Sequence, residues 1–255
     1  MTNQNRHDQI LQLLEQKGEL QVSELAALFH VTPITIRRDL DYLESEGKLI
    51  RVRGKAQLNN ADIMHEKPLE FRLKSHMANK LKIAKLASSF IRQGERIFIG
   101  SGSTLYYLAK TIDNSKRLWV ITDAINSAGE LCAKSNLSIF VIGGELTSST
   151  LTTSGSYAES IIQDLHFDTA YISSTCVGMD GSIYHRSFSE HGIYKHLPQC
   201  ADRLVLLADS TKLGKTSFVK VGTLKAGDTL ITDREADPAL IQQYQKLGIQ
   251  VKIAE

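Results

Sequence analysis

The chain has 255 residues, 42% of them hydrophobic, and its 30 lysines and arginines nearly balance 28 aspartates and glutamates. This composition excludes a disordered or fibrous chain, and the length predicts one large domain or two unequal ones. No apolar run approaches the roughly 18 residues of a membrane span, and the polar N-terminus cannot form the apolar core of a secretory signal. We therefore expect a cytoplasmic protein that does not bind a membrane.

The spacing of cysteine and histidine predicts neither disulfides nor a metal site. Cys132, Cys176 and Cys200 lie far apart and form no C-x-x-C pair, so we expect buried thiols in a reducing compartment. The histidines within residues 185–196 lack the three- or four-residue spacing of helical metal ligands. We expect no metal.

Three helices are predicted at the start of the chain. Apolar residues recur at helical spacing over residues 6–17 and again over 24–29, with a very short strand between them. Thr32 and Pro33 then form a strong helix start, because the hydroxyl can cap the helix and the proline fits its first turn. The third helix is expected to run from Pro33 to about Glu46.

A basic hairpin is predicted directly after the third helix. Residues 48–53 alternate apolar and basic side chains before Gly54, as a strand does when one of its faces is buried. Arg51, Arg53 and Lys55 should therefore share the exposed face. Helices followed by such a hairpin are typical of a winged helix-turn-helix, which places its third helix in the major groove of DNA. We assign residues 1–58 to this domain.

The outward face of the third helix carries groups suited to DNA. Thr32 and Thr35 can reach phosphates or base edges, Arg37 and Arg38 can bond guanine, and the basic hairpin can lie along the adjacent backbone. The alternative is a solvated helix face, which is what two adjacent arginines usually form. The first 60 residues carry 8 basic and 8 acidic side chains, so net charge does not decide between the two.

This segment resembles a known signature. The pattern Arg6-x3-Ile10-x3-Leu14, then seventeen residues, then Thr32-Pro-Ile-Thr35-Ile36-Arg37-Arg38-Asp39-Leu40 is similar to the helix-turn-helix signature of the DeoR family of bacterial sugar-responsive transcription regulators. The resemblance implies DNA contacts from Thr35, Arg37 and Arg38, whereas Asp39 should orient an arginine or a helix. Gly54-Lys55-Ala56 stands where the family usually has Gly-Gly-Ala, and Lys55 should add a phosphate contact.

Residues 59–95 are expected to form a linker and a connector helix. A polar break is followed by Pro68 and then by an apolar helical stripe from Leu73 to Ile91, which ends at Gly94. We interpret the lysines on its other faces as solubilising. These are Lys74, Lys80, Lys82 and Lys85. The connector should seat the C-terminal domain and contribute to a homo-oligomer, a dimer or a tetramer.

Short apolar runs alternate with segments of helical length over residues 96–255. Continuous β-branched runs of this kind predict an α/β domain with a mostly parallel sheet and helices on both faces. Ligands of such sheets bind outside the carboxyl ends of the strands, so the residues that follow each run form the candidate site.

Four of these loops suit a phosphorylated sugar, although each taken alone also fits an ordinary turn. The glycine- and serine-rich loop 100–104 can bind phosphate at a helix N-terminus. Other loops offer a carboxylate and an amide for sugar hydroxyls, a glycine pair, and lysines for an anion. The candidate effector residues are Ser101, Gly102, Ser103, Thr104, Asp123, Asn126, Gly143, Gly144, Glu145 and Lys212.

The same loops resemble the effector domain of the DeoR family, so the resemblance spans nearly the whole chain. It implies a fold shared with ribose-5-phosphate isomerase and glucosamine-6-phosphate deaminase, and a pocket for a sugar phosphate or a related metabolite. The resemblance also implies that Gly155, Asp168 and Glu190, which match family positions, line or support that pocket. This chain departs from the family at Gly100, where an aspartate is common, and at Ser103 and Asp123, where threonine and asparagine are.

The alternative is a sugar-phosphate isomerase or deaminase-like enzyme that carries a DNA-binding domain, since loop 100–104 also resembles the isomerase phosphate loop. Isomerisation needs a positioned carboxylate base, and the chain lacks the isomerase's Asp-Gly-Ala-Asp-Glu and Lys-Gly-Gly-Gly stretches. Glu145, Asp168 and Glu190 remain candidate bases. We therefore predict a regulator with no catalytic residues and no cofactor, which binds double-stranded operator DNA, represses a carbohydrate operon and is released by a phosphorylated sugar.

Overall fold

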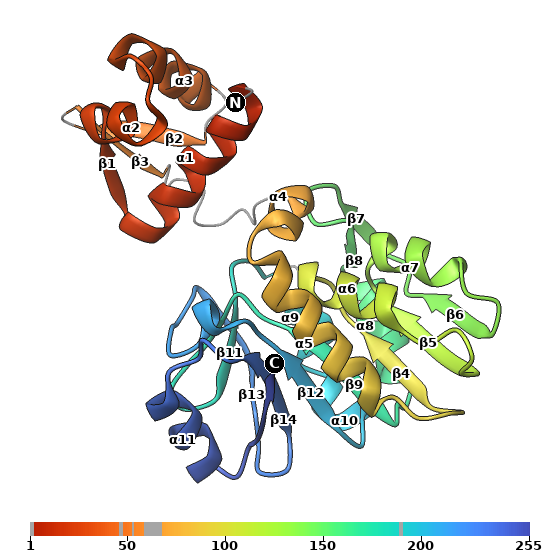
Figure 1. The fold of residues 1–255 in the computed structure, drawn as a ribbon. Coiled ribbons are helices and arrows are strands. Elements are labelled where there is room, and N and C mark those ends of the chain that lie inside the picture. Colours follow the sequence, from red (N-terminus) through yellow and green to blue (C-terminus); the bar gives the residue numbers. More distant parts are fainter. Residues whose placement is uncertain (1–2, 46–47, 53, 59–67, 189–190) are drawn as a thin grey trace. The chain divides into compact units, whose positions relative to one another are not determined.

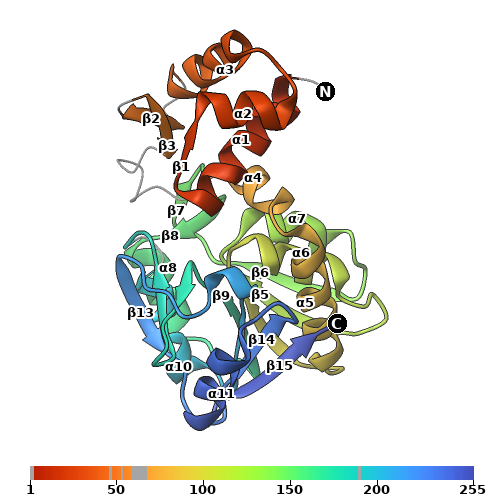
Figure 2. The ribbon, with the colours of Figure 1, turned by 60° about the vertical axis from the view of Figure 1, so that its left-hand side comes forward.

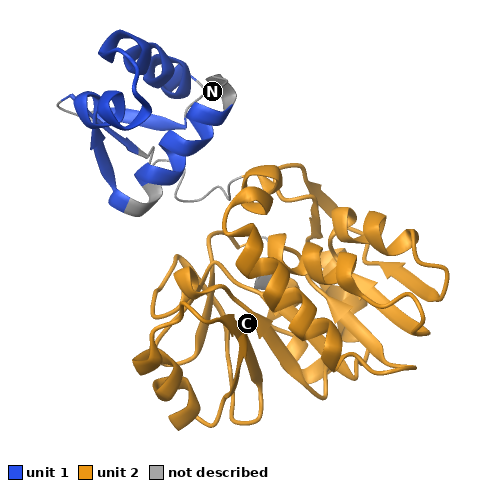
Figure 3. Ribbon diagram, in the orientation of Figure 1, with its two compact units in different colours: residues 1–65 blue, residues 66–255 orange. Residues whose placement is uncertain are grey.

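The computed structural model describes residues 3–45, 48–52, 54–58, 68–188 and 191–255. Its contacts divide the chain into two compact units, residues 1–65 and residues 66–255 (Figure 3). We refer to them as the N-terminal unit and the C-terminal unit.

The N-terminal unit is a three-helix domain with a small antiparallel sheet in the order β1-β3-β2 (Figure 1). Its elements are α1 (Asn3–Lys17), β1 (Glu19–Gln21), α2 (Val22–Phe29), α3 (Pro33–Ser45), β2 (Leu49–Val52) and β3 (Lys55–Leu58). Ile10 and Leu14 of α1, Leu25 of α2, and Ile36 and Leu40 of α3 are fully buried, so the apolar stripes of the three helices share one core. The predicted winged helix-turn-helix is confirmed.

Local signals set the ends of these elements. The Thr32 hydroxyl accepts a hydrogen bond from the Thr35 N–H at 3.3 Å, which caps α3 as predicted. Val52 pairs with Lys55 across β2 and β3, and Gly54 between them has a φ of +81° that favours glycine. The tight turn of the wing is thus kept even though lysine follows the glycine. Arg53 lies outside the described residues.

The C-terminal unit is built on a seven-stranded, fully parallel sheet in the order β15-β14-β12-β9-β4-β5-β6 (Figures 1 and 2). The strands are β4 (Arg96–Ile99), β5 (Leu118–Thr122), β6 (Leu137–Val141), β9 (Thr169–Ser173), β12 (Leu204–Leu207), β14 (Thr229–Asp233) and β15 (Gln250–Ala254). The predicted parallel sheet is confirmed, and each strand corresponds to one of the apolar runs.

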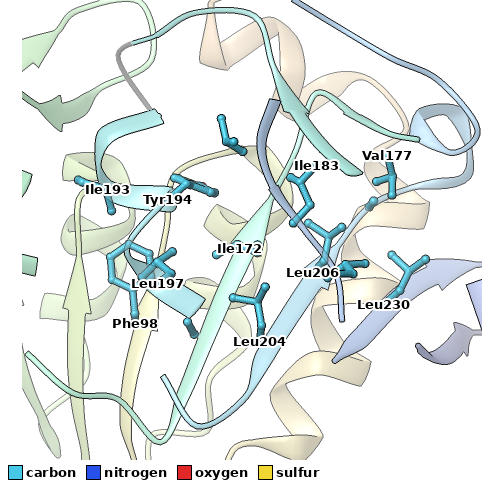
Figure 4. Packing of buried hydrophobic residues seen from close by; sticks show 14 of the residues in the cluster. Phe98, Ile172, Val177, Ile183, Ile193, Tyr194, Leu197, Leu204, Leu206 and Leu230 are labelled. Atoms are coloured by element: carbon cyan, nitrogen blue, oxygen red, sulfur yellow. The ribbon is translucent and has the colours of Figure 1, made fainter. Parts of the chain in front are cut away.

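Helices cover both faces of this sheet. One buried cluster joins the sheet to α5 (Met77–Phe90), α6 (Ser103–Thr111) and α7 (Ile125–Cys132). The other joins it to α8 (Ser156–Gln163), α9 (His191–Tyr194), α10 (Leu197–Cys200) and α11 (Pro238–Lys246). Figure 4 shows Phe98 of β4 and Ile172 of β9 in this second cluster, together with Tyr194 and Leu197. Both faces of the sheet are therefore covered by helices, as the continuous apolar runs of its strands predicted.

Shorter elements extend the carboxyl end of the sheet. The strands β7 (Glu145–Thr147) and β8 (Thr152–Ser154) form a hairpin, and β10 (Cys176–Val177), β11 (Ser182–His185) and β13 (Val219–Thr223) form a second antiparallel sheet. A short 3-10 helix, η2 (Ser210–Lys212), follows β12. These elements hold the loops that the sequence analysis selected.

The connector differs from its prediction. Two helices, α4 (Leu69–Lys74) and α5, replace the single helix, because His76 between them adopts a left-handed φ of +49°. The helix α5 ends at Phe90 rather than Gly94 and packs on the sheet. Met77 of the predicted apolar stripe is 51% exposed.

Two further findings concern expectations about the whole chain. Cys200 is buried, but Cys176 is half-buried and Cys132 is exposed at the end of α7, so the prediction of three buried thiols is wrong for Cys132. Among the helices that the structure describes, none is long and apolar enough to cross a membrane.

Candidate DNA-binding surface and effector site

The outward face of α3 carries polar and apolar groups side by side. Arg37 and Arg38 are exposed, and Ile34 is 67% exposed although it is a β-branched apolar residue. The hydroxyl oxygens of Thr32 and Thr35 lie 3.0 Å apart at the first turn. Helical spacing places Ile34 three residues before Arg37 and four before Arg38, so these side chains form one continuous surface.

The wing arginine and lysine are engaged within the unit. The Arg51 Nε donates to Glu44 Oε2 at 3.0 Å, and its guanidinium also contacts Asp41. Lys55 forms an ion pair with Glu19 of β1. These two cations are half-buried rather than fully exposed as expected, because the carboxylates of α3 and β1 lie beside the hairpin.

Asp39 faces the core of the N-terminal unit. Its carboxylate accepts hydrogen bonds from Arg6 Nε at 2.6 Å and from Arg6 Nη2 at 3.0 Å, and His7 Nε2 lies 2.9 Å from it. Burial by itself would raise the pKa of Asp39, but the hydrogen bonds from Arg6 and His7 outweigh burial and hold the pKa below its ordinary value. Asp39 orients an arginine, as the family resemblance implied.

The loop after β4 forms the N-terminus of α6. The helix begins at Ser103, and the Tyr106 N–H donates to Gly102 O at 2.9 Å. Backbone N–H groups at the first turn of a helix have no intrahelical acceptor. The hydroxyl of Thr104 is also buried and has no partner among the described residues.

Gly102 is required where β9 meets this loop. Its φ is +125°, and a side-chain carbon there would collide with Ser173 Oγ. Ser173 Oγ in turn donates to Ser101 O at 2.8 Å, which fixes the loop against the end of β9. The neighbouring Ser174 hydroxyl is buried and makes no hydrogen bond within the described structure.

Lys212 reaches the same place from the far side of β9. Its Nζ donates to Ser174 O at 2.5 Å, so the loops after β12, β9 and β4 meet. Asp209, three residues before Lys212 in the same loop, is buried. Burial by itself would raise the pKa of Asp209, but Lys212, a hydrogen bond from Thr211 and Lys80 outweigh it and lower the pKa.

Lys80 is the residue that sequence reasoning missed. It was interpreted as solubilising, yet it is 4% exposed, and its Nζ donates to Arg72 O at 2.6 Å and Ser75 O at 2.7 Å. Burial, with smaller effects of Lys212 and Arg72, lowers its pKa to about 8 against the opposing effect of Asp209. A signal was present, because Lys80 lies three residues before Ile83 and so falls on the buried stripe.

A second group of predicted residues lies after β5. Asp123 is buried, and its carbonyl accepts hydrogen bonds from the Thr153 N–H at 2.8 Å and the Thr153 hydroxyl at 3.1 Å. Thr153 also donates to Ile142 O at 2.5 Å, which ties together the loops after β5 and β6. The side-chain amide of Asn126 is buried without a partner in the described residues.

The glycine pair turns the chain into the β7–β8 hairpin. Gly144 has a φ of +143°, and a side chain there would collide with Ser154 O. Glu145 is exposed at the start of β7, beside Gly155. The sheet order β12-β9-β4-β5-β6 therefore places Lys212, loop 100–104, Asp123 and Gly143 in succession along one edge of the sheet, the edge formed by the carboxyl ends of the strands.

Of the candidate catalytic carboxylates, Glu145 lies at this edge and Asp168 does not. Asp168 precedes β9 at the opposite edge of the sheet, where the Arg96 Nη2 lies 2.8 Å from its Oδ1. Asp168 therefore does not lie among the loops that follow the strands, and its role as a supporting residue or a base stays a prediction. Glu190 lies outside the described residues. Among those described, no group of three or more histidine, cysteine, aspartate or glutamate side chains could hold a metal ion.

Together these features define a class of protein: a winged helix-turn-helix protein with a C-terminal α/β domain. Residues 6–62 match the DeoR-like helix-turn-helix domain, and residues 75–234 match the DeoR C-terminal sensor domain. The chain belongs to the DeoR family of transcriptional regulators.

Curated relatives align over almost their full lengths. The chain is 32% identical to the HTH-type transcriptional regulator GolR of Listeria innocua, over 98% of each chain. It is 32% identical to the HTH-type transcriptional repressor GlcR of Bacillus subtilis, over 100% of this chain and 98% of the relative. Among solved structures, ribose 5-phosphate isomerase A of Methanocaldococcus jannaschii is 18% identical with a TM-score of 0.41, over 55% of each chain.

Proposed function

We propose that this protein represses a carbohydrate-utilisation operon by binding operator DNA, and that a phosphorylated sugar at the carboxyl edge of the parallel sheet releases it. Several relatives carry matching names, among them the glycerol-3-phosphate regulon repressor of Escherichia coli and the lactose phosphotransferase system repressor of Streptococcus mutans. The proposal places the protein in the cytoplasm, with its DNA.

The DNA contacts are assigned first to α3. Arg37 and Arg38 are exposed and can bond guanine bidentately, while Thr32 and Thr35 can contact phosphate or base edges. The exposed Ile34 suits the methyl group of thymine, since an apolar contact is how that base is distinguished in the major groove. Arg51, Arg53 and Lys55 are assigned to backbone phosphates, and Arg51 and Lys55 must exchange their carboxylate partners for phosphate.

The effector site rests on one observation: Lys212 meets the N-terminus of α6 through Ser173 and Ser174. Free N–H groups at a helix N-terminus and an ammonium group together favour a phosphate. The buried hydroxyls of Thr104 and Ser174 supply further donors that are unused in the described structure. Asp123 and Asn126, which follow the neighbouring strand β5, are assigned to the sugar hydroxyls, with Gly143, Gly144 and Glu145 bordering them.

We propose no reaction at this site. The relatives are named as transcriptional regulators. Acid–base catalysis needs a carboxylate positioned as a base; Asp168 lies at the opposite ends of the strands, paired with Arg96, and we assign Asp123 and Glu145 to ligand binding rather than to proton transfer. The effector acts instead through different affinities for DNA-binding and released arrangements of a homo-oligomer. Sedimentation across micromolar concentrations tests the assembly, and a monomer throughout would contradict it.

The deciding experiment is fluorescence anisotropy of the full chain on DNA taken from upstream of its own gene. The DNA complex is titrated with glycerol 3-phosphate, glucose 6-phosphate, fructose 1-phosphate and the corresponding unphosphorylated compounds. We expect binding at least a hundredfold tighter than to random DNA of equal length, and release by one phosphorylated compound only. Specific binding that no compound reverses would overturn the effector assignment. Absence of specific binding at low salt would overturn the proposal that the protein represses from an operator in that DNA.

A further inference from the structure

Helix α4 is held at both ends by bonds to other parts of the C-terminal unit. At its start, the Leu69 N–H donates to Ser149 O at 3.3 Å. At its end, Lys80 Nζ donates to the carbonyls of Arg72 and Ser75, and the Tyr107 hydroxyl donates to Leu73 O at 3.0 Å. The last turn of α4 thus gives three carbonyls to side chains of α5 and α6.

Each of these anchors belongs to an element of the candidate effector site. Tyr107 lies on α6, whose first turn is the anion-binding N-terminus. Ser149 lies in the turn of the β7–β8 hairpin, which follows Gly143 and Gly144. Lys80 interacts electrostatically with Asp209 and Lys212 of the loop after β12. A helix of six residues is therefore attached to three of the loops that the effector would touch.

The charges around Lys80 make this attachment sensitive to an anion. Lys80 is buried, as is Asp209 of opposite charge, and the half-buried Lys212 and Arg72 of like charge also act on it. Two of its three N–H donors are committed to the carbonyls of α4. A phosphate bound beside Lys212 attracts the Lys80 ammonium and competes with those carbonyls for it, because an ammonium group is attracted more strongly by an anionic oxygen than by a neutral carbonyl.

We propose that Lys80 is the positioning residue that couples the effector site to α4, and that α4 is the first element to respond when the anion binds. The inference rests on the proposed effector site. Residues 59–67 join α4 covalently to the winged helix-turn-helix, so a displaced or loosened α4 changes the restraint on the chain that leads to the DNA-binding domain. An effector can release the protein from DNA only if its affinity differs between the DNA-binding and released states. A ligand with equal affinity for both does not change their populations.

Hydrogen–deuterium exchange of the full chain tests the coupling, with saturating inorganic phosphate as the probe and chloride of equal ionic strength as the reference. In the natural protein, phosphate should slow exchange at residues 100–105 and change it at least twofold at residues 69–75. In Lys80→Met, the response at residues 100–105 should persist and the response at residues 69–75 should be lost. Lys85→Met, which removes an exposed lysine of the same helix, should behave like the natural protein.

Two outcomes would overturn the inference while leaving the proposed function intact. One is a response at residues 100–105 with none at 69–75 in the natural protein. The other is an α4 response that survives in Lys80→Met. No response at residues 100–105 in the natural protein would overturn the anion site, and the coupling with it. Should Lys80→Met fold poorly, Lys80→Gln keeps a hydrogen-bond donor but removes the charge and should likewise lose the α4 response; a response that survives in it would overturn the inference.

Discussion

The guanidinium of Arg6 in α1 and the carboxylate of Asp39 in α3 form a buried pair, with Nε and Oδ2 2.6 Å apart and both side chains less than 8% exposed. His7 completes the cluster at 2.9 Å from the same carboxylate and stacks on Tyr42. The run Arg37-Arg38-Asp39 is therefore divided by function. Its arginines face solvent on the surface assigned to DNA, and its aspartate fixes the angle between α3 and α1.

Replacing Asp39 by alanine should destabilise the N-terminal unit by about 3–5 kcal/mol, because it leaves Arg6 buried without a counter-charge. Native-state hydrogen exchange of the amides of α1 and α3 measures the opening of this unit. Asp41→Ala, at an exposed position of the same helix, should cost less than about 1 kcal/mol. Equal effects of the two substitutions would contradict the role given to Asp39.

The Asp39 cluster also sets an acid limit. Since the folded pKa lies below the ordinary value, the carboxylate contributes stability above the unfolded pKa of about 4, and that contribution is lost as the pH falls through the folded pKa. In Asp39→Ala this part of the acid dependence should be absent.

Arg38→Ala should lose about 1–3 kcal/mol of binding to operator DNA if its guanidinium pairs with a guanine. Anisotropy on operator and on random duplex separates base contact from phosphate contact. Lys17→Ala, an exposed cation at the end of α1, is the control and should change neither affinity. Equal weakening on both duplexes would reassign Arg38 to the phosphate backbone.

Lys55→Gln should reduce the slope of log affinity against log salt by about one, because one phosphate contact is lost. Glu19→Gln provides the opposite change. It removes the carboxylate that pairs with Lys55 and should tighten binding at low salt without altering the preference among DNA sequences. An unchanged slope in Lys55→Gln would mean that the ion pair with Glu19 persists on DNA.

Ser103→Asp should keep DNA binding and raise the effector concentration for half-release at least tenfold. An aspartate at the first turn suits the dipole of α6, so the helix is retained, but its charge repels a phosphate from the same N–H groups. The measurement is release of operator DNA by the active compound from the sugar-phosphate panel. Ser160→Asp, exposed on α8, is the charge-matched control. Normal release in Ser103→Asp would move the phosphate away from α6.

Phosphate affinity should fall as the pH rises through about 8, because Lys80, whose pKa is lowered to about 8, then loses its proton. A bound anion raises that pKa, so binding above pH 8 takes up a proton. Calorimetry in two buffers of different ionisation enthalpy measures this uptake directly. It should vanish in Lys80→Met and persist in Lys85→Met. The charged groups that influence the pKa of Lys80 are Lys212, Asp209 and Arg72.

Much of the architecture was predictable because its signals are local. Thr32 and Pro33 mark the start of α3, and a helix cap depends on neighbouring residues only. The apolar runs became the seven strands of the sheet. The five inner strands are largely buried, and a strand buried on both faces must be apolar throughout. Loop 100–104 was selected by the rule that parallel strands present ligands at their carboxyl ends.

The mistaken or untested predictions concern residues whose environment is built by distant parts of the chain. The helical spacing of Lys80 to Ile83 indicates its buried face, but only the break between α4 and α5 supplies the carbonyls of Arg72 and Ser75 that its ammonium group needs there. Asp168, which the family resemblance grouped with the residues that line or support the pocket, lies before β9 and pairs with Arg96. Whether it supports the pocket from that end of the strand stays a prediction.

The sequence by itself determined the winged helix-turn-helix, the parallel sheet and the loops at its carboxyl edge, because periodicity, caps and apolar runs act over a few residues. Tertiary structure alone decided which charges meet. Arg6 finds Asp39 across 33 residues, and Lys212 finds Ser174 across 38. The energy of such pairs depends on distance and burial, and both are set only when the helices and strands have packed.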